Sequence, residues 1–238
     1  MNKTKKIILF QVTPAVLLIF GTITTCIAYK AEIDRNIRSA KMKRFNHLAF
    51  EYKDIRAMQS LIKCYADAGE TLNYTLLLKK SIHSSFFEGA KLAIENGANP
   101  NTVDEGGWAP LHFVANGHLK DTKEDREERV QIAELLLENK ADIEAKTTTG
   151  ELTPLHLAAG SGQTEMVQLL IKNHAPLFEK DASGSLPIEL ALKNEYEQTA
   201  EVLEKAMKKE MEEQKLPPIK VGDHFLRAVN ENTSHEYQ

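Results

Sequence analysis

The pattern of hydrophobic and polar positions divides the chain into an apolar beginning and a long amphipathic remainder. From Ile7 to Tyr29 no side chain carries a charge over 23 residues. A helix of that length, rising about 1.5 Å per residue, crosses the roughly 30 Å hydrocarbon core of a bilayer. The pattern therefore predicts one transmembrane-type helix. Pro14 is compatible with it, because membrane helices tolerate proline better than soluble ones.

Two other interpretations of this apolar stretch stay open. A cleavable signal peptide would end near Cys26 to Ala28, although its apolar region is usually only about 7–15 residues long. A buried core helix would also be apolar. The downstream flank, including a basic linker at 31–43, is more basic than the upstream one. By the positive-inside rule, we expect the rest of the chain to be cytoplasmic. Three lysines before the span are also typical of an export signal, so a periplasmic or secreted location is the alternative.

Beyond the linker, helical periodicity recurs in units of similar sequence. One copy reads Gly-Glu-Leu-Thr-Pro-Leu-His-Leu-Ala-Ala from Gly150 and continues with an apolar helical run from Glu165 to Ile171. An upstream copy has Pro110, and a downstream copy has Pro187, at the place of Pro154. The downstream spacing is 33 residues and the upstream spacing is 44. A repeated period of about 20–50 residues predicts a solenoid of stacked units.

This unit resembles an ankyrin repeat over its full length, and 33 residues is the ankyrin period. The resemblance implies an all-α fold: an ankyrin-repeat solenoid of helix-turn-helix units with β-hairpin-like loops, preceded here by the one hydrophobic transmembrane-type helix. It also implies that the Thr153 hydroxyl engages His156, so that this histidine is structural. Each unit's proline should start a helix, because the first helical amides have no acceptor within the helix.

The resemblance covers about residues 44–206, and two units within it lack the Thr-Pro-Leu-His run. A helix over 201–211 with an apolar stripe beside many charges is expected to cap the array, because terminal repeats need a polar outer face. We therefore expect an anchor or signal segment at 1–30 and the basic juxtamembrane linker at 31–43. An ankyrin-repeat domain should follow at 44–206, with clear repeats at about 104–145, 148–180 and 181–206 and degenerate units at about 44–67 and 73–101. A C-terminal capping-helix extension with a flexible tail should occupy 207–238.

The longer upstream spacing places ten extra residues between the two helices of that repeat and one more in the hairpin around Leu152. The ten lie within His118 to Arg129, where nine of twelve residues are charged. Their alternating signs are compatible with i,i+4 pairing along an extended helix. We expect an exposed helical extension that lies outside the core and is not needed for folding. A partner-specific finger is the functional alternative.

Composition and charge remove several functional classes. With 30 basic and 34 acidic residues, a formal charge of -4 and a pI near 6.1, the chain is not a polybasic nucleic-acid binder. Its two cysteines exclude a disulfide framework and a multi-cysteine metal site. The histidines lack ligand-like spacing, and phosphate-binding, nucleophile-elbow and kinase motifs are absent from the sequence. We expect no enzyme activity, metal, cofactor, small-molecule substrate or nucleic acid.

The function that remains is protein binding. We expect a membrane-tethered, monomeric protein that binds another protein, because a solenoid presents hairpin tips and first helices as one continuous concave surface. The alternative is an exported or secreted ankyrin protein, freed of its first 28 residues, that acts as an inhibitor, accessory or host-directed effector. Trp108 is the most informative position, since exposed tryptophans are favoured hot spots, although packing against the Asp104-Glu105 hairpin is the structural alternative. The candidate partner-binding residues are Glu105, Trp108, Asn116, Thr147, Thr149, Glu151, Ser161, Ser183, Ser185 and Asn194.

Overall fold

The structure is a computed structural model that describes residues 49–67, 72–117, 122–217, 219–221 and 224–226. The chain forms two compact units, which divide between Thr71 and Leu72 and are described one at a time. The predicted membrane segment at 7–29 and the linker at 31–43 lie outside the described residues, so both stay predictions. Among the residues that are described, no helix combines the length and the apolar character that a bilayer crossing requires.

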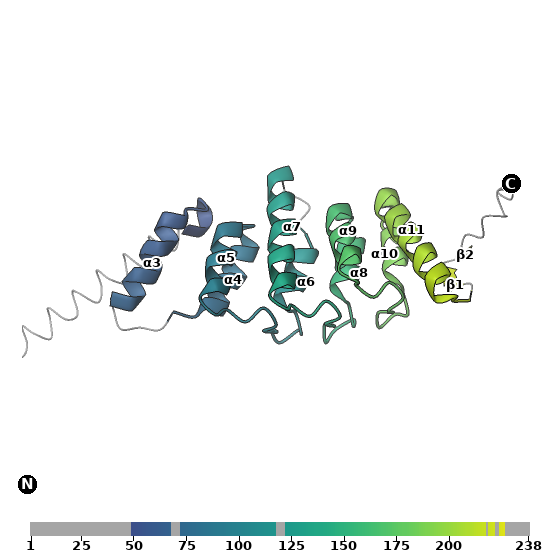
Figure 1. Cartoon of the computed structure of the whole chain (residues 1–238), viewed down its shortest axis with the longest axis horizontal. Helices are drawn as coiled ribbons and strands as arrows, with labels where there is room; N and C mark the ends of the chain where they lie inside the picture. The colour runs from purple at the N-terminus through teal and green to yellow at the C-terminus, as the bar shows by residue number, and fades with distance from the viewer. Residues whose placement is uncertain (1–48, 68–71, 118–121, 218, 222–223, 227–238) are drawn as a thin grey trace, which may run out of the picture. The chain divides into compact units, whose positions relative to one another are not determined.

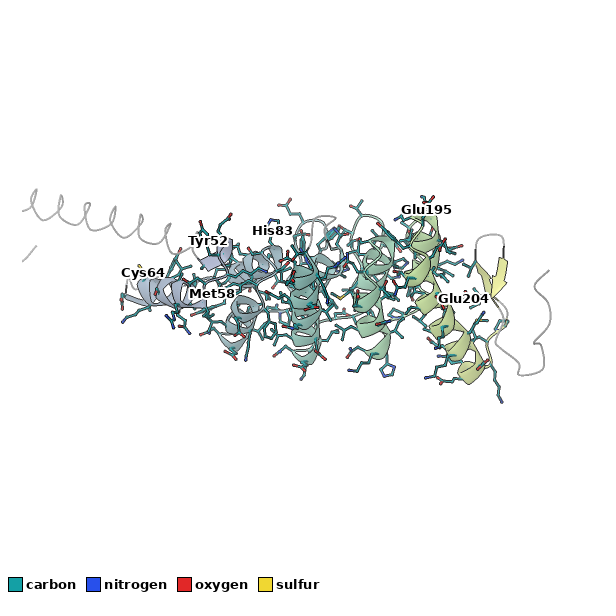
Figure 2. The ribbon with its side chains drawn as sticks, turned by 90° about the horizontal axis from the view of Figure 1, so that it is seen from above. Tyr52, Met58, Cys64, His83, Glu195 and Glu204 are labelled. Atoms are coloured by element: carbon teal, nitrogen blue, oxygen red, sulfur yellow. The ribbon has the colours of Figure 1, made fainter. Side chains whose placement is uncertain are left out.

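The described part of the first unit is built around helix α3 (Ile55–Asp67). The Asp54 carboxylate opens the helix by accepting hydrogen bonds from the backbone N–H of Arg56 at 2.9 Å and of Ala57 at 3.2 Å. One face of α3, which includes Met58, is buried. Cys64, labelled on α3 in Figure 2, is half-buried. The degenerate unit expected at 44–67 thus ends in a helix, and its assignment as a repeat stays a prediction.

The second unit stacks helix pairs in two layers (Figure 1). The first helix of each pair contacts the first helix of the next pair, and second helices likewise contact second helices. Leu111, Leu155 and Leu170 are fully buried in this stack. The predicted helical repeat fold is confirmed, since each pair buries its apolar face against its neighbours. The pairs are α4 (Tyr74–His83) with α5 (Phe87–Glu95), α6 (Pro110–Ala115) with α7 (Lys123–Glu138), α8 (Pro154–Gly160) with α9 (Thr164–Lys172), and α10 (Pro187–Lys193) with α11 (Glu197–Gln214).

Proline starts three of the first helices, as predicted: α6 at Pro110, α8 at Pro154 and α10 at Pro187. The residue before each proline is extended, which is the conformation that a following proline favours. At α8 the Thr153 hydroxyl lies 2.8 Å from Nδ1 of His156 and accepts from the His156 backbone N–H at 3.4 Å. The interaction implied for this threonine and histidine is therefore confirmed.

The histidine of the Pro-Leu-His run connects each repeat to the loop of the next one. In the first copy, Nδ1 of His112 accepts from the Ala109 backbone N–H at 3.1 Å. Its Nε2 lies 3.0 Å from the Ala145 carbonyl and 3.1 Å from the Leu152 carbonyl. Because Nδ1 accepts, we assign the proton to Nε2, which then donates to the next loop. The ring is fully buried, so one neutral side chain satisfies backbone groups of two repeats.

His156 repeats this arrangement, with the Thr153 backbone N–H donating to Nδ1 at 3.2 Å and Nε2 lying 3.2 Å from the Ser185 carbonyl. Burial lowers the pKa of both His112 and His156 below the ordinary value, because it penalises the charged imidazolium. A second proton would also place an N–H group at Nδ1 opposite another N–H donor. Both rings are therefore held neutral in the folded state.

We expect the free energy of unfolding to fall as the pH drops below about 6.5, the unfolded-state pKa of histidine. The folded-state pKa values are lower, so the unfolded chain binds more protons in this window. The stability contributed by the two neutral histidines is therefore fully present above about pH 6.5. It decreases as the pH falls from there toward the lower folded-state pKa, by up to about 1.4 kcal/mol per pH unit for each histidine. Urea unfolding between pH 7.5 and 5.5 measures the slope. His156→Gln should reduce it and His174→Gln, at an exposed histidine, should not; equal slopes in the two variants would contradict the assignment.

The last helix pair is built as an end of the stack. Glu189 replaces the histidine, and its Oε2 accepts from the Leu186 backbone N–H at 2.8 Å, which keeps the local helix cap. Leu192 stands at the place of Ala115 and Ala159, which are both fully buried, and is itself 51% exposed. Within the described residues no further helix pair follows α10 and α11. The changes to Glu189 and Leu192 are therefore compatible with a last repeat, on which no further repeat packs.

Helix α11 carries the predicted capping stripe on its buried side, where Leu203, Met207 and Met211 are fully buried. Beyond it, β1 (Ile219–Val221) pairs antiparallel with β2 (His224–Leu226), with Ile219 opposite Leu226. The repeats are all-α as expected, but part of the segment expected as a flexible tail forms this strand pair. Strand-forming residues flanking a Gly-Asp dipeptide in the sequence favour such a hairpin.

The inserted residues extend α7, as predicted. Helix α7 has 16 residues where α9 has 9, and it reaches beyond its neighbours in Figure 1. Thr122 starts it by accepting from the Asp125 backbone N–H at 3.1 Å. Lys123 and Glu127 form an exposed i,i+4 ion pair at 3.6 Å. Residues 118–121 of the insertion lie outside the described residues.

The end of the insertion is buried, and the expectation that it lies outside the core is wrong there. Arg129 is only 3% exposed, and its guanidinium donates to the Phe113 carbonyl near the end of α6 at 3.2 Å. A Glu128 carboxylate oxygen accepts from the backbone N–H of Phe87, the first residue of α5, at 3.1 Å. These two side chains satisfy backbone groups that a helix cannot satisfy at its own ends.

Two ten-residue deletions should separate the exposed part of the insertion from the buried part. Removing residues 118–127 leaves Glu128 and Arg129 in place and shortens α7 to residues 128–138, which is 11 residues against 9 in α9, so unfolding in urea should stay within about 1 kcal/mol of the parent. Removing 120–129 takes both residues away and should cost about 3 kcal/mol or more. Equal losses in the two deletions would contradict the assigned roles of Glu128 and Arg129.

Candidate partner-binding surface

Three described loops between helix pairs lie on the same side of the second unit (Figure 1). We call them finger 1 (99–109), finger 2 (142–153) and finger 3 (176–186). Each is closed by a backbone hydrogen bond, from Asp104 N to Trp108 O at 3.2 Å, from Thr147 N to Leu152 O at 3.1 Å and from Asp181 N to Ser185 O at 3.0 Å. The closing bond of finger 2 spans one residue more than the others, which confirms the single extra residue expected there.

Neighbouring fingers are joined to one another. The Thr148 N–H donates to the Gly106 carbonyl at 2.9 Å, and the Ala182 N–H donates to the Gly150 carbonyl at 2.9 Å. Lys146 of finger 2 and Glu179 of finger 3 form an ion pair at 2.7 Å. The three loops therefore present one preformed surface, which reduces the ordering cost of binding a partner.

Trp108 is held firmly and is half-buried. Asp104 Oδ1 accepts from the backbone N–H of both Gly106 and Trp108 at 2.9 Å, which sets the turn that carries the indole. The indole centroid lies 5.2 Å from the Phe113 ring and 6.1 Å from the His112 ring. The tryptophan thus packs on α6 of its own repeat as well as on its hairpin, and part of the ring remains accessible.

Finger 1 exposes a mixture of apolar and acidic side chains around this turn. Glu105 is exposed, as expected. Val103 is 55% exposed and was not among the predicted site residues, although it directly precedes Asp104 where fingers 2 and 3 have Lys146 and Lys180. That departure from lysine is the sequence feature that could have identified it. Residues 103–106 line an open, shallow depression.

Finger 2 exposes Thr149 and Glu151, as expected, but Thr147 is only 2% exposed. Its hydroxyl donates to the Thr149 carbonyl at 2.9 Å and accepts from the Leu152 backbone N–H at 3.1 Å. Thr147 therefore has the turn-forming role that Asp104 has in finger 1. The expectation that Thr147 is exposed is wrong, because its side chain is hydrogen-bonded inside the loop.

Finger 3 uses its predicted serines within its own turn. The Ser183 hydroxyl donates to Asp181 Oδ1 at 2.6 Å and lies 2.9 Å from the Ser185 hydroxyl. Burial alone would raise the pKa of Asp181, but hydrogen bonds from Ser183 and from the backbone of Ser183 and Ser185 outweigh it and lower this pKa. Ser183 is exposed and Ser185 half-buried, so both reach the surface from a fixed turn.

The predicted residues at the ends of the first helices form contacts between neighbouring repeats. The Ser161 hydroxyl lies 3.5 Å from Asn116 Oδ1, at the limit of a hydrogen bond. Asn194 Nδ2 donates to the Gly160 carbonyl at 2.6 Å. Asn116 and Ser161 are half-buried and Asn194 is exposed. All three are the C-cap residues of first helices, so they lie at the opposite helix ends from the fingers and from Trp108.

The finger surface is acidic. Fingers 1, 2 and 3 together carry seven carboxylates and two lysines, whereas helices α6 and α8 carry no Asp, Glu, Lys or Arg. The Glu179 hydrogen bond raises the pKa of Lys146, so one of the two cations is already neutralised by a neighbour. The negative charge is concentrated around finger 1 and the base of finger 2.

Residues 125–213 match the family model described as ankyrin repeats in three copies. Helices α8, α9 and α10 and all but the last residue of α11 lie within this match, as do fingers 2 and 3 and His156. The chain carries ankyrin repeats.

The curated relatives of this chain are longer than the chain and differ from one another. It is 26% identical to the human ankyrin repeat and SOCS box protein 16, over 77% of this chain and 39% of that protein. It is 26% identical to the tyrosine-protein kinase Shark of Drosophila melanogaster over 66% of this chain and 16% of the kinase. It is 32% identical to inversin of Canis lupus familiaris over 46% of this chain and 11% of inversin. The chain spans less than two fifths of these curated relatives.

Ankyrin repeats indicate binding of another protein, and the surface has the features that such binding requires. Within the described ranges no group of three or more His, Cys, Asp or Glu side chains could hold a metal ion. The half-exposed aromatic ring, the fixed turns and the joined fingers are features that protein contact surfaces commonly have. Which of the predicted residues contact a partner stays a prediction.

Proposed function

We propose that this chain is a non-catalytic protein that binds another protein through the finger side of its ankyrin repeats, with Trp108 at the centre of the contact. The observation that carries the proposal is the half-exposed indole of Trp108, whose backbone N–H is bound by Asp104 and whose ring packs on Phe113. A tryptophan fixed before binding adds contact area without losing further side-chain freedom. Glu105, Thr149 and Glu151 would form the polar rim around it.

Membrane tethering is a separate part of the proposal and rests on the apolar sequence from Ile7 to Tyr29. A retained anchor gives an intact mass near 26.7 kDa in the membrane fraction. A soluble species that begins near Tyr29 would instead support export. Mass spectrometry of fractionated cells decides between the two without reference to the repeats.

Trp108→Ala should lower recovery of the partner at least tenfold when the tagged full chain, in a neutral detergent, is used to capture proteins from its native cells. A central tryptophan commonly contributes 2 kcal/mol or more to binding, or about thirtyfold in affinity. Quantitative mass spectrometry of the captured proteins measures the loss. Gln168→Ala, an exposed change on α9 away from the fingers, is the matched control and should recover the partner like the parent.

The thermal unfolding midpoint must be measured for each variant, because the indole also packs on Phe113. Trp108→Phe keeps an aromatic ring on that contact and should restore folding if Trp108→Ala is destabilised. Equal recovery of the same proteins by the folded Trp108 variants and the parent would remove Trp108 from the binding surface.

A further inference from the structure

We infer that the partner of finger 1 is a basic protein segment, whose lysine or arginine side chain lies on the Trp108 indole. This inference rests on the proposed function, because it assigns the chemistry of the partner at that same surface. It follows from three observations: an accessible apolar patch, the charge around it, and the absence of a competing cation in the described structure.

The accessible apolar side chains of finger 1 are Val103 and Trp108, which precede and follow its turn in the chain, and the Phe113 ring lies 5.2 Å from the indole between ring centroids. Val103 is 55% exposed, and Trp108 and Phe113 are both half-buried. The closing bond of finger 1 and the Asp104 hydrogen bonds keep the ring and the valine in place. This surface can cover the aliphatic part of a long side chain, since lysine and arginine carry apolar stems below their charged groups.

The charge of the surrounding residues selects a cation. Asp104 and Glu105 are exposed at the turn, and Glu151 is exposed on the adjacent finger. The face of an indole attracts a cation, an interaction that strengthens when water is excluded. Carboxylates beside the ring add a charge-assisted hydrogen bond to the same group. An acidic peptide or a nucleic acid would be repelled by this charge.

No cation of the described structure occupies this place. Within the part of the chain that the structure describes, neither Asp104 nor Glu105 takes part in an ion pair, whereas Lys146 of finger 2 is held by Glu179 at 2.7 Å. Val103 stands where the other fingers have Lys146 and Lys180, so finger 1 also lacks the lysine that its neighbours have. Finger 1 therefore presents carboxylates and an aromatic face to which no cation of the described residues is bound.

Peptide binding to the full chain in a neutral detergent tests this partner chemistry. The probes are a twelve-residue peptide that alternates arginine and leucine and its counterpart with citrulline in place of arginine, which keeps the shape and removes the charge. Trp108 is the sole tryptophan of the chain, so its fluorescence and its indole N–H resonance report binding at this position. We expect saturable changes with the arginine peptide, and affinity at least tenfold weaker for the citrulline peptide.

Two matched charge changes separate a local effect from general attraction. Glu105→Gln should weaken binding of the arginine peptide about fivefold, because it removes one exposed carboxylate next to the indole. Glu165→Gln removes the same charge from the exposed side of α9 and should leave affinity within twofold of the parent. Equal affinity for the two peptides, equal effects of the two variants, or no change in the Trp108 signals up to millimolar peptide would each overturn the inference.

The outcome is distinguishable from a failure of the proposed function. If capture of a partner depends on Trp108 but the arginine peptide does not bind, the basic chemistry is wrong and the binding surface stands. If the captured partner is indifferent to Trp108 in folded variants, the surface itself is wrong.

Discussion

Gly107→Ala is expected to lower the free energy of unfolding by about 3 kcal/mol or more. Gly107 has φ +74°, and a Cβ there would lie 2.6 Å from the Thr148 backbone nitrogen. Backbone of the next finger cannot move away without losing the Thr148 N–H bond to the Gly106 carbonyl. The cost combines about 1–2 kcal/mol for the left-handed conformation with the displaced contact between two repeats.

Gly97→Ala is the matched control, because Gly97 has φ +89° and a Cβ there meets nothing within 4 Å. It should cost only the conformational part, about 1–2 kcal/mol. Urea unfolding followed by circular dichroism measures both variants. A similar loss in the two would show that the contact between fingers adds nothing to stability.

Arg129→Ala is expected to destabilise the chain by about 2–4 kcal/mol. The side chain is 3% exposed and donates to the Phe113 carbonyl at 3.2 Å. Truncation leaves a buried carbonyl without this donor and removes the packed stem of the arginine, which opens a cavity between α6 and α7. Equilibrium unfolding in urea gives the change directly.

Arg126→Ala removes the same side chain from an exposed position of α7, one turn earlier, and should stay within about 0.5 kcal/mol of the parent. If both arginine variants behaved alike, Arg129 would be another solvated charge of the insertion, as its sequence context suggests. The difference between the two variants therefore measures how far the insertion belongs to the core.

The starts of the helices could be predicted because they depend on local chemistry. Proline suits the first helical position whatever surrounds it, so Pro110, Pro154 and Pro187 each located a helix. The extension of α7 was predictable for the same reason, since side chains four residues apart on a helix are always neighbours.

The candidate site was less predictable, because exposure in a loop depends on which hydrogen bonds the loop makes. Thr147 and Thr149 are indistinguishable as sequence, yet the hydroxyl of Thr147 closes finger 2 and is buried. Val103 was overlooked because a single apolar residue in a polar loop gives no periodic pattern. Whether the remaining candidates contact a partner is a question for the capture experiment.

The sequence by itself determined the repeat unit, its helix starts, the pairing of Thr153 with His156 and the capping helix, because each is specified within one unit or by comparison between units. Only the tertiary structure decided which charged residues are buried. Glu128 and Arg129 belong to a run of charges that looks fully solvated, but stacking brings them against the ends of α5 and α6. The backbone N–H and C=O groups at helix ends have no partner within their own helix and need polar partners from elsewhere. The local sequence pattern does not show which side chains will supply them.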